Sequence, residues 1–196
     1  MEMKKLGLKV ALITVTALIA VASLAYIVAR IAFPSSLASV YGNAGNYSRA
    51  SQLLINAYDS RGNFDDITAA CEYAVKSKND TLIIKSVGKL IDDEKFSEYN
   101  ITDNDSATFL TSRYVVALYG AEQDKAAVVD KAFSLLVGYP PHNQVEALIV
   151  KAYDENDKQT LAFIKERLNA IDASTLSAEQ KTTYENDLYV IENALK

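Results

Sequence analysis

The chain has one cysteine, one histidine, three prolines and seven glycines in 196 residues. A single cysteine excludes an intramolecular disulfide framework and any cysteine-based zinc site. A single histidine excludes a metal site built from several histidines. The scarcity of proline and glycine argues against disorder and against a loop-rich β architecture. What is present instead is a series of apolar-periodic segments separated by short polar breaks, which predicts an all-α fold.

The residues that could carry chemistry do not form a catalytic or metal-binding pattern. Cys71 falls on an apolar stripe and is expected to be a small buried hydrophobe, and nothing places His142 beside a serine or cysteine nucleophile. The acidic runs at 92–94, 103–105 and 154–157 lack the central Gly and closing Glu of a calcium loop. No glycine-rich phosphate loop is present. We therefore expect no enzyme activity, no metal site and no cofactor.

Residues 10–29 form an apolar run of twenty residues without a charge. A helix needs about 20 apolar residues to cross a hydrocarbon core of about 30 Å. The run predicts a transmembrane helix, with residues 1–33 forming a basic stub and an anchor that contacts the bilayer through residues 10–33. The alternative is a cleavable signal peptide, because residues 20–22 have the small-x-small form of a cleavage site. The run exceeds the apolar core of an ordinary signal peptide, about 7 to 15 residues, which favours a retained anchor.

The charges around this run predict its orientation. Three lysines and one glutamate precede it, whereas a single arginine lies at its other end: Lys4, Lys5, Lys9, Glu2 and Arg30. The positive-inside rule places the N-terminus in the cytoplasm and residues 34–196 outside it. Those four basic residues and Glu2 give the first 33 residues a charge of +3, which leaves −8 for the rest out of a total of −5. Because a domain this acidic repels negative charge, we expect no nucleic-acid partner and only poor binding of its surface to anionic lipid.

A helical stripe repeats every 17 residues through the middle of the chain. Its first full copy is Ala50, Leu53, Leu54, Ala57 and Tyr58, and adding 17 to each number gives Ile67, Ala70, Cys71, Ala74 and Val75. The same step reaches Ile84, Val87, Gly88 and Ile91 in one direction, and Phe33, Leu37, Val40 and Tyr41 in the other. Each unit begins after a Gly-Asn pair, 45–46 or 62–63, which suits a helix end followed by an N-cap. Two units make a helical hairpin of about 34 residues.

The pattern breaks and then resumes. We expect the polar residues 97–105 to form a loop between two blocks of hairpins, and Pro140 and Pro141 to begin a helix. Further stripes, each typical of a helix with one buried face, are Tyr114, Val115, Leu118 and Tyr119; Val128, Ala132, Leu135 and Leu136; Val145, Leu148, Ile149, Ala152 and Tyr153; Leu161, Ile164, Leu168 and Ile171; and Tyr184, Leu188, Ile191 and Leu195.

At these positions the sequence resembles the tetratricopeptide repeat family. Within residues 50–80 the matching positions are Leu54, Tyr58, Gly62 at the inter-helix turn, Phe64 and Ala74. The chain departs from the motif at Ser51, Ile55, Ile67, Cys71 and Asn79, where the family has Trp, Gly, Ala, an aromatic residue and Pro. The resemblance implies that residues 34–196 form an α-solenoid of stacked hairpins whose concave face binds proteins or peptides.

The resemblance also implies which side chains would contact a partner. The family's groove positions fall on Arg49, Gln52, Asn56, Asp59 and Ser60, and looser matches add Arg113, Gln144, Lys151 and Asp154. The alternative interpretation is that these polar residues are the solvated face of amphipathic helices.

The hypothesis at this point is a membrane-anchored scaffold or assembly factor that docks another, membrane-associated protein. The alternative is a constitutive structural subunit of a membrane complex that uses both its transmembrane helix and its solenoid. Small residues in the anchor would permit close helix packing: Ala17, Ala20, Ala22, Ser23 and Ala25.

Overall fold

The computed structural model describes the backbone of residues 2–196 and the side chains from residue 12 onward. In this part of the chain 82% of the residues are helical and no strand occurs. The all-α prediction is confirmed. The lysines on which the predicted orientation depends, Lys4, Lys5 and Lys9, lie outside the described side chains.

Eleven α-helices and one 3-10 turn follow one another along the described chain. They are α1 (Glu2–Ala32), α2 (Pro34–Asn43), α3 (Tyr47–Arg61), α4 (Phe64–Ser77), α5 (Asp80–Ile91), α6 (Phe96–Thr102), α7 (Asn104–Ala121), α8 (Lys125–Ser134), α9 (Gln144–Asp154), α10 (Lys158–Asn169), η1 (Ala173–Thr175) and α11 (Ala178–Leu195).

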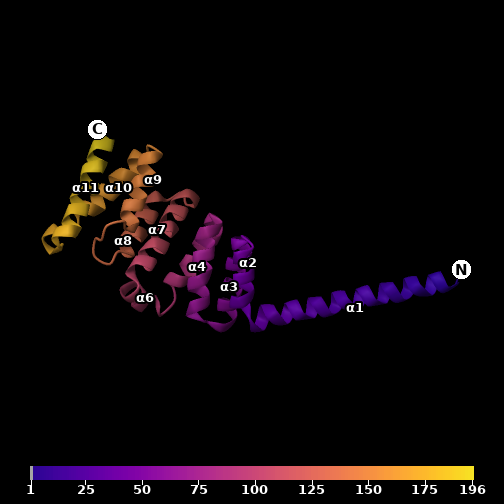
Figure 1. Cartoon of the computed structure of the whole chain (residues 1–196). Coiled ribbons are helices and arrows are strands. Elements are labelled where there is room, and N and C mark those ends of the chain that lie inside the picture. The colour runs from indigo at the N-terminus through magenta and orange to yellow at the C-terminus, as the bar shows by residue number, and fades with distance from the viewer. Residues whose placement is uncertain (1) are drawn as a thin grey trace.

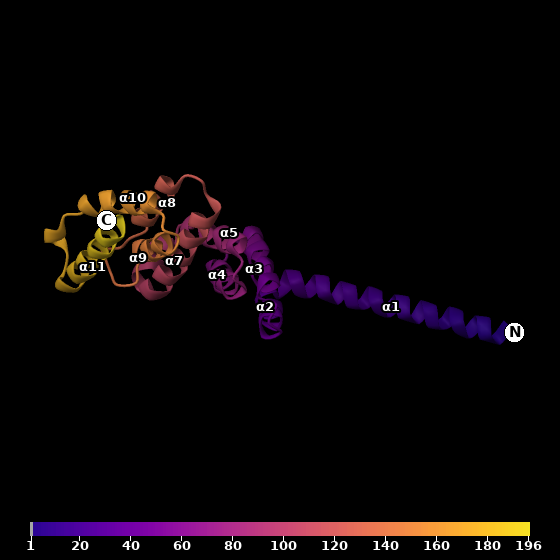
Figure 2. The same cartoon turned by 90° about the horizontal axis from the view of Figure 1, so that it is seen from above.

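Helix α1 projects away from the other helices, which form one row from α2 at its base to α11 at the far end (Figures 1 and 2). The segment Leu12–Ala32 of α1, 21 residues long, is long and apolar enough to cross a membrane, and none of it is buried. Along the row, helices contact their neighbours in sequence and also their second neighbours, so that α3, α5, α7, α9 and α11 touch in succession. Every helix after α1 thus buries one face between adjacent helices.

The helix ends follow the local signals of the sequence. The side chains of Asn46, Asn63 and Asn79 cap α3, α4 and α5 by accepting hydrogen bonds from backbone N–H groups of the first turn. Gly62 ends α3 in the left-handed conformation, with φ of 64°, which glycine adopts without the strain that a Cβ would introduce. The predicted helices around residues 50–58, 67–75 and 84–91 are therefore confirmed.

Tyrosines near the ends of helices join segments far apart in sequence. Tyr58 at the end of α3 donates a hydrogen bond to Asp93 just after α5, at 2.7 Å. Tyr119 at the end of α7 donates one to Asp157 just after α9, at 2.8 Å. Burial raises the pKa of Asp157, whereas hydrogen bonds from Thr160 and Tyr119 lower it. The bonds outweigh burial, so the pKa lies below its usual value. The two bonds tie equivalent corners of the helix row together.

The prediction of a loop at residues 97–105 is wrong. Residues 96–102 form the short helix α6, and α7 begins at Asn104. Phe96 and Asn100, four residues apart, are buried on one face of α6, and Tyr99 packs edge-on against Phe64 with ring centroids 5.6 Å apart. A helix of about two turns is too short for its polar sequence to show an apolar period.

Two smaller expectations are also corrected. Pro140 and Pro141 do not begin a helix, because they lie in the loop before α9, whose N-cap is Asn143. Of the stripe predicted here, Leu37 and Tyr41 pack partly buried against the core, whereas Phe33 and Val40 are exposed, and the fully buried residues of α2 are Pro34, Ala38 and Gly42. Small residues face the neighbouring helices here, since α2 lies close against them.

The close packing of α2 against its neighbours predicts that a side chain added at Gly42 will destabilise the fold. A Cβ on Gly42 would lie 2.4 Å from Cε1 of Tyr73, a half-buried ring that is stacked on Tyr47 with centroids 6.3 Å apart. We expect Gly42→Ala to lower the free energy of unfolding by about 1–3 kcal/mol through this overlap. The matched control is Gly88→Ala in the middle of α5, where the nearest atom would be Tyr114 Cε2 at 3.8 Å.

The control substitution should raise stability by about 0.5–1 kcal/mol, because alanine loses less backbone entropy than glycine in a helix. Urea unfolding of the full-length chain in detergent, monitored by the helical signal in circular dichroism, measures the free energy of unfolding of both variants. Equal effects of the two substitutions would contradict the packing of α2 against Tyr73.

Candidate binding groove

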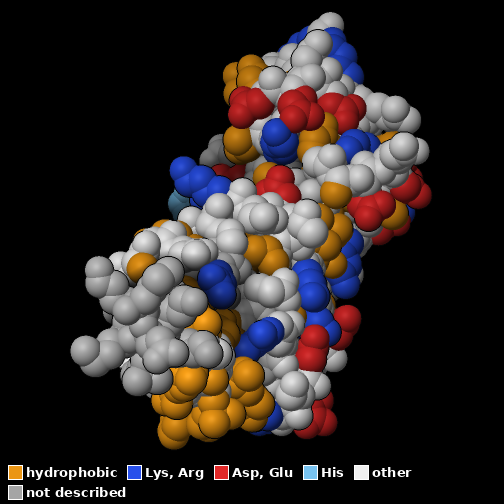
Figure 3. All heavy atoms as spheres, turned by 90° about the vertical axis from the view of Figure 1, so that its right-hand side faces the viewer, with side chains coloured by type: hydrophobic (Ala, Val, Ile, Leu, Met, Phe, Trp, Pro, Cys, Tyr) orange, Lys and Arg blue, Asp and Glu red, His pale blue; other side chains and the backbone are white. Residues whose placement is uncertain are grey.

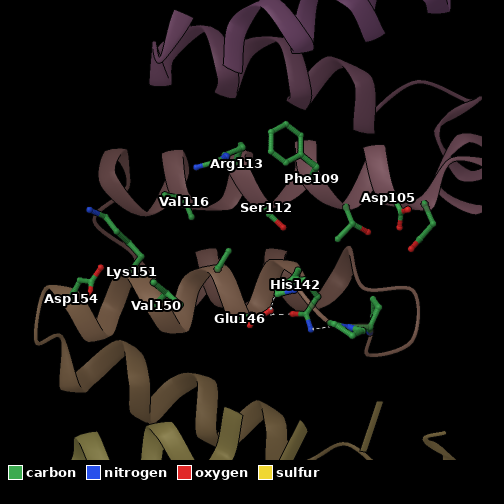
Figure 4. Close-up of a pocket in the computed structure, with 16 residues that line it drawn as sticks. Asp105, Phe109, Ser112, Arg113, Val116, His142, Glu146, Val150, Lys151 and Asp154 are labelled. Atoms are coloured by element: carbon green, nitrogen blue, oxygen red, sulfur yellow. Dashed lines mark hydrogen bonds and ion pairs between the residues drawn. The ribbon is translucent and has the colours of Figure 1, made fainter. Parts of the chain in front are cut away.

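A groove of about 760 Å³ runs between α7 and α9 and is closed at one end by the loop of Pro140–Asn143 (Figure 4). Its walls are adjacent faces of the two helices. Helix α7 contributes Asn104, Asp105, Thr108, Phe109, Ser112, Arg113 and Val116, and α9 contributes Glu146, Ala147, Val150, Lys151 and Asp154. We call this feature the α7–α9 groove.

Each wall exists because its helix has two distinct faces. The buried face of α7 includes Leu110 and Tyr114, and that of α9 includes Leu148 and Ala152, whereas Phe109, Arg113 and Val150 lie off these buried faces. Two of these side chains are large and apolar, and Phe109 and Val150 are 50% and 55% exposed. Exposed apolar side chains that line one groove mark a place where a protein surface can bind another molecule.

The charged groups of the groove lie along its length rather than at one point. Figure 4 shows His142 and Glu146 near the loop end, and Lys151 with Asp154 near the other end. Lys151 pairs with Glu155 at 2.6 Å, and this hydrogen bond raises the pKa of Lys151. The guanidinium of Arg113 lies 5.4 Å from the centre of the Phe109 ring, and no ion pair within residues 12–196 involves Arg113.

Unused hydrogen-bonding capacity also lies in the groove walls. Within residues 12–196, two buried side-chain oxygens have no hydrogen-bond partner, Ser112 Oγ and Glu146 Oε2. Nδ1 of His142 lies 3.4 Å from that Glu146 oxygen, but the imidazole is 92% exposed. Buried polar atoms are normally satisfied, and these two oxygens are the exceptions in the groove walls.

A buried polar connection fixes the distance between the two walls. Gln144 at the start of α9 donates a hydrogen bond from Nε2 to Thr111 Oγ1 of α7 at 2.6 Å, and both side chains are buried. Asn143 caps α9 through bonds from the N–H groups of Val145 and Glu146. The groove is therefore preformed between helices that are hydrogen-bonded to each other beneath it.

The structure divides the residues predicted to contact a partner into two groups. Arg113 and Lys151 line the α7–α9 groove together with Asp154. Gln144 does not line the groove, because its side chain is buried and hydrogen-bonded to Thr111. The residues on α3 lie elsewhere: Asn56 and Ser60 line a smaller crevice beside the end of α1, and Arg49 contacts α1 directly.

The remaining two predicted residues on α3 are engaged within the domain. Gln52 donates a hydrogen bond from Nε2 to Asn56 Oδ1 at 3.0 Å. Asp59 pairs with Lys89 of α5 at 2.7 Å. The five positions on α3 thus do not join the α7–α9 groove in one continuous site.

Sequence reasoning missed Phe109 and Val150, the apolar residues that give the groove its character. The apolar stripes predict core residues, and these two residues fall outside the stripes. An apolar residue off the buried stripe of an amphipathic helix was the available signal.

The described residues place neither a metal-binding cluster nor a cysteine in the groove. No group of three or more His, Cys, Asp or Glu within the described residues is placed to hold a metal. The lone thiol, Cys71, is fully buried on α4, and burial raises its pKa to about 12, which leaves it protonated and unreactive at neutral pH. Comparisons with protein-family models, curated proteins and solved structures gave no match.

Proposed function

We propose that the chain is a single-pass membrane protein whose helical domain docks another protein, acting as a scaffold or assembly factor. The observation that carries this proposal is the preformed α7–α9 groove, with half-exposed Phe109 and Val150 flanked by the unpaired Arg113. A rigid groove of this kind loses little conformational entropy on binding, so its apolar contacts translate efficiently into affinity.

The proposal includes the tetratricopeptide-like character of the domain. It is supported by the succession of helical hairpins, by the contacts of every second helix along the row, and by the equivalent tyrosine bonds at the ends of α3 and α7. In such a solenoid each hairpin buries its face only against its neighbours.

The proposal also places the N-terminus in the cytoplasm and the helical domain on the other side of the membrane. Its support is the excess of lysine before residue 10 and the unburied apolar surface of Leu12–Ala32. A C-terminal tag protected from protease added to intact cells would contradict this orientation. The partner is expected at the same membrane, because residue 34 already begins the domain and leaves no linker after α1.

Site-specific photo-crosslinking in cells tests the docking function. A photoreactive residue at Val150, in the groove, is compared with one at Tyr189, which is 69% exposed on α11 and outside the groove. We expect one discrete crosslinked protein from position 150 and none from position 189. Adding Phe109→Asp in the same chain should abolish the product, since a charge replaces the apolar contact. Identical products from both positions, or a product insensitive to Phe109→Asp, would reject the groove as the docking site.

A second candidate function is a constitutive subunit of a membrane complex. The observation that favours it is that α1 projects freely, so its small residues Ala17, Ala20 and Ala22 are available to other membrane helices (Figure 1). Mild detergent extraction distinguishes the two. An obligate subunit leaves the membrane only within a fixed complex, whereas a docking factor is extracted alone or with variable partners.

A further inference from the structure

A second, smaller crevice lies where α1 meets the helical domain. It has a volume of about 250 Å³ and lies between the last turns of α1 and one face of α3. Helix α1 contributes Arg30 and Ile31, and α3 contributes Leu53, Asn56, Ala57 and Ser60, with Arg61 at the edge. We call it the α1–α3 crevice. Pockets for whole small molecules are usually larger, about 300–1,000 Å³, so it has room for a small group only.

The crevice lies at the level where a membrane would end. Arg30 is two residues before the end of the apolar segment Leu12–Ala32, which corresponds to about 3 Å along a helix axis. One turn earlier, Tyr26 accepts hydrogen bonds from Tyr41 at 3.1 Å and from Arg49 at 3.3 Å. Tyrosine and arginine are enriched at membrane surfaces, because they combine an apolar body with a polar end.

Positive charge gathers at this point of an otherwise acidic domain. The guanidinium of Arg49 lies 4.7 Å from the Tyr41 ring centre, and no ion pair within residues 12–196 involves Arg30 or Arg49. Arg61 pairs with Asp66 at 2.6 Å through one of its nitrogens, which leaves other N–H donors available. Figure 3 shows this side of the molecule. Several Lys and Arg side chains lie beside the hydrophobic area near α1, whereas Asp and Glu side chains are most numerous in the upper half.

The same crevice has polar donors at one side and an apolar wall at the other. The Asn56 amide oxygen already accepts from Gln52, so its N–H groups remain as donors. Leu53 and Ala57 form the wall together with Ile31, which is 70% exposed and continues the apolar surface of α1. A phosphate fits the donor side, and a hydrocarbon chain attached to it would continue along α1. A soluble phosphate would make no use of the apolar wall.

We propose that the α1–α3 crevice binds the phosphate headgroup of an anionic phospholipid, with Arg30 as the main contact and the acyl chain lying along α1. This inference rests on the proposed insertion of α1 into a membrane. Its consequence is that lipid binding fixes the orientation of the helical domain relative to the bilayer, since the headgroup contacts α1 and α3 together.

Native mass spectrometry of the full-length protein in detergent tests the proposal. The probes are phosphatidylglycerol and phosphatidylcholine with identical acyl chains, and glycerol phosphate as a soluble competitor. We expect one phosphatidylglycerol molecule to be retained in preference to phosphatidylcholine. Arg30→Gln should weaken that retention about fivefold, the effect of one cation near a membrane surface. Arg113→Gln, in the other groove, is the control and should leave retention unchanged, with equal helicity in all three proteins.

The other outcomes overturn the inference in distinguishable ways. Equal retention of the two lipids, or unchanged retention in Arg30→Gln, would show that the crevice does not select a lipid headgroup. Displacement of phosphatidylglycerol by equimolar glycerol phosphate would assign the crevice to soluble phosphates. Failure of the protein to enter lipid nanodiscs would instead reject the membrane anchor itself, which is the proposed function rather than this site.

Discussion

Replacing Asp187 by Asn is expected to remove a loss of stability that the native protein undergoes between about pH 4 and pH 6. Asp187 lies on α11 and is only 6% exposed, and it accepts a 2.6 Å hydrogen bond from the buried hydroxyl of Tyr139. Burial raises the pKa of Asp187 to about 6, the Tyr139 bond opposes the rise, and the charge of Glu146 adds to it. Burial and the neighbouring carboxylate likewise raise the pKa of Tyr139, so the phenol remains the donor.

The direction of the effect follows from the raised pKa. The folded protein holds the proton more tightly than the unfolded chain, whose aspartates titrate near pH 3.9. The favourable contribution of protonated Asp187 is therefore complete below about pH 4 and is lost as the pH rises through the folded pKa near 6. The loss amounts to about 3 kcal/mol at neutral pH, as an order of magnitude.

An asparagine keeps an oxygen that can accept from Tyr139 but stays neutral at every pH. The measurement is the free energy of unfolding from pH 4 to 7.5 for both proteins, and the difference between them isolates this residue because all other titrating groups are shared. We expect Asp187→Asn to gain on the native protein by up to about 3 kcal/mol as the pH rises. A constant difference across the range would show that Asp187 is ionised in the fold.

Replacing Arg61 by Ala is expected to cost about 3 kcal/mol of stability, because it removes the cation from a buried carboxylate. Arg61 ends α3 and pairs at 2.6 Å with Asp66, which is 2% exposed in the first turn of α4. Ser35 at the start of α2 donates a second hydrogen bond to Asp66 at 3.0 Å. The carboxylate thus joins three helices, and without Arg61 it would keep its burial but lose its countercharge.

The chain contains a matched control for this substitution. Arg167 pairs with Asp130 at the same distance, 2.6 Å, but both side chains are about half exposed, at 47% and 53%. Arg167→Ala should therefore cost no more than about 1 kcal/mol, since water replaces the lost partner. Urea unfolding of the two variants beside the native protein is the measurement. Similar losses of stability from both substitutions would show that the burial of Asp66 does not make the loss of its ion pair with Arg61 more costly.

The helices could be predicted because their signals are local. The stripe around Leu54 and the N-cap at Asn63 depend on residues within one or two turns, and the structure has the helices there. The α7–α9 groove could not be predicted, because it forms between helices that α8 separates in sequence. Its depth depends on the contact between Thr111 and Gln144, 33 residues apart, which no periodicity reveals.

The partner-binding face predicted on α3 is a second case in which the sequence did not reveal the tertiary packing. Arg49, Asn56 and Ser60 do share one face of α3, as their spacing required. The sequence did not reveal that the end of α1 lies beside this face, because the direction of α1 depends on the turn into α2 at Pro34. Helical spacing identifies a shared face, whereas tertiary packing determines what lies against it.

The order of the helix row has a consequence for the height at which a partner would bind. Helix α1 is attached at the α2 end, and the row extends away from it in both views (Figures 1 and 2). From α3 to α9 there are three steps between second neighbours, and packed helices are about 8–10 Å apart, so the α7–α9 groove lies about 20–25 Å from α3. In the proposed membrane orientation, a membrane-bound partner would therefore need a stalk or a globular part of similar height to reach the groove.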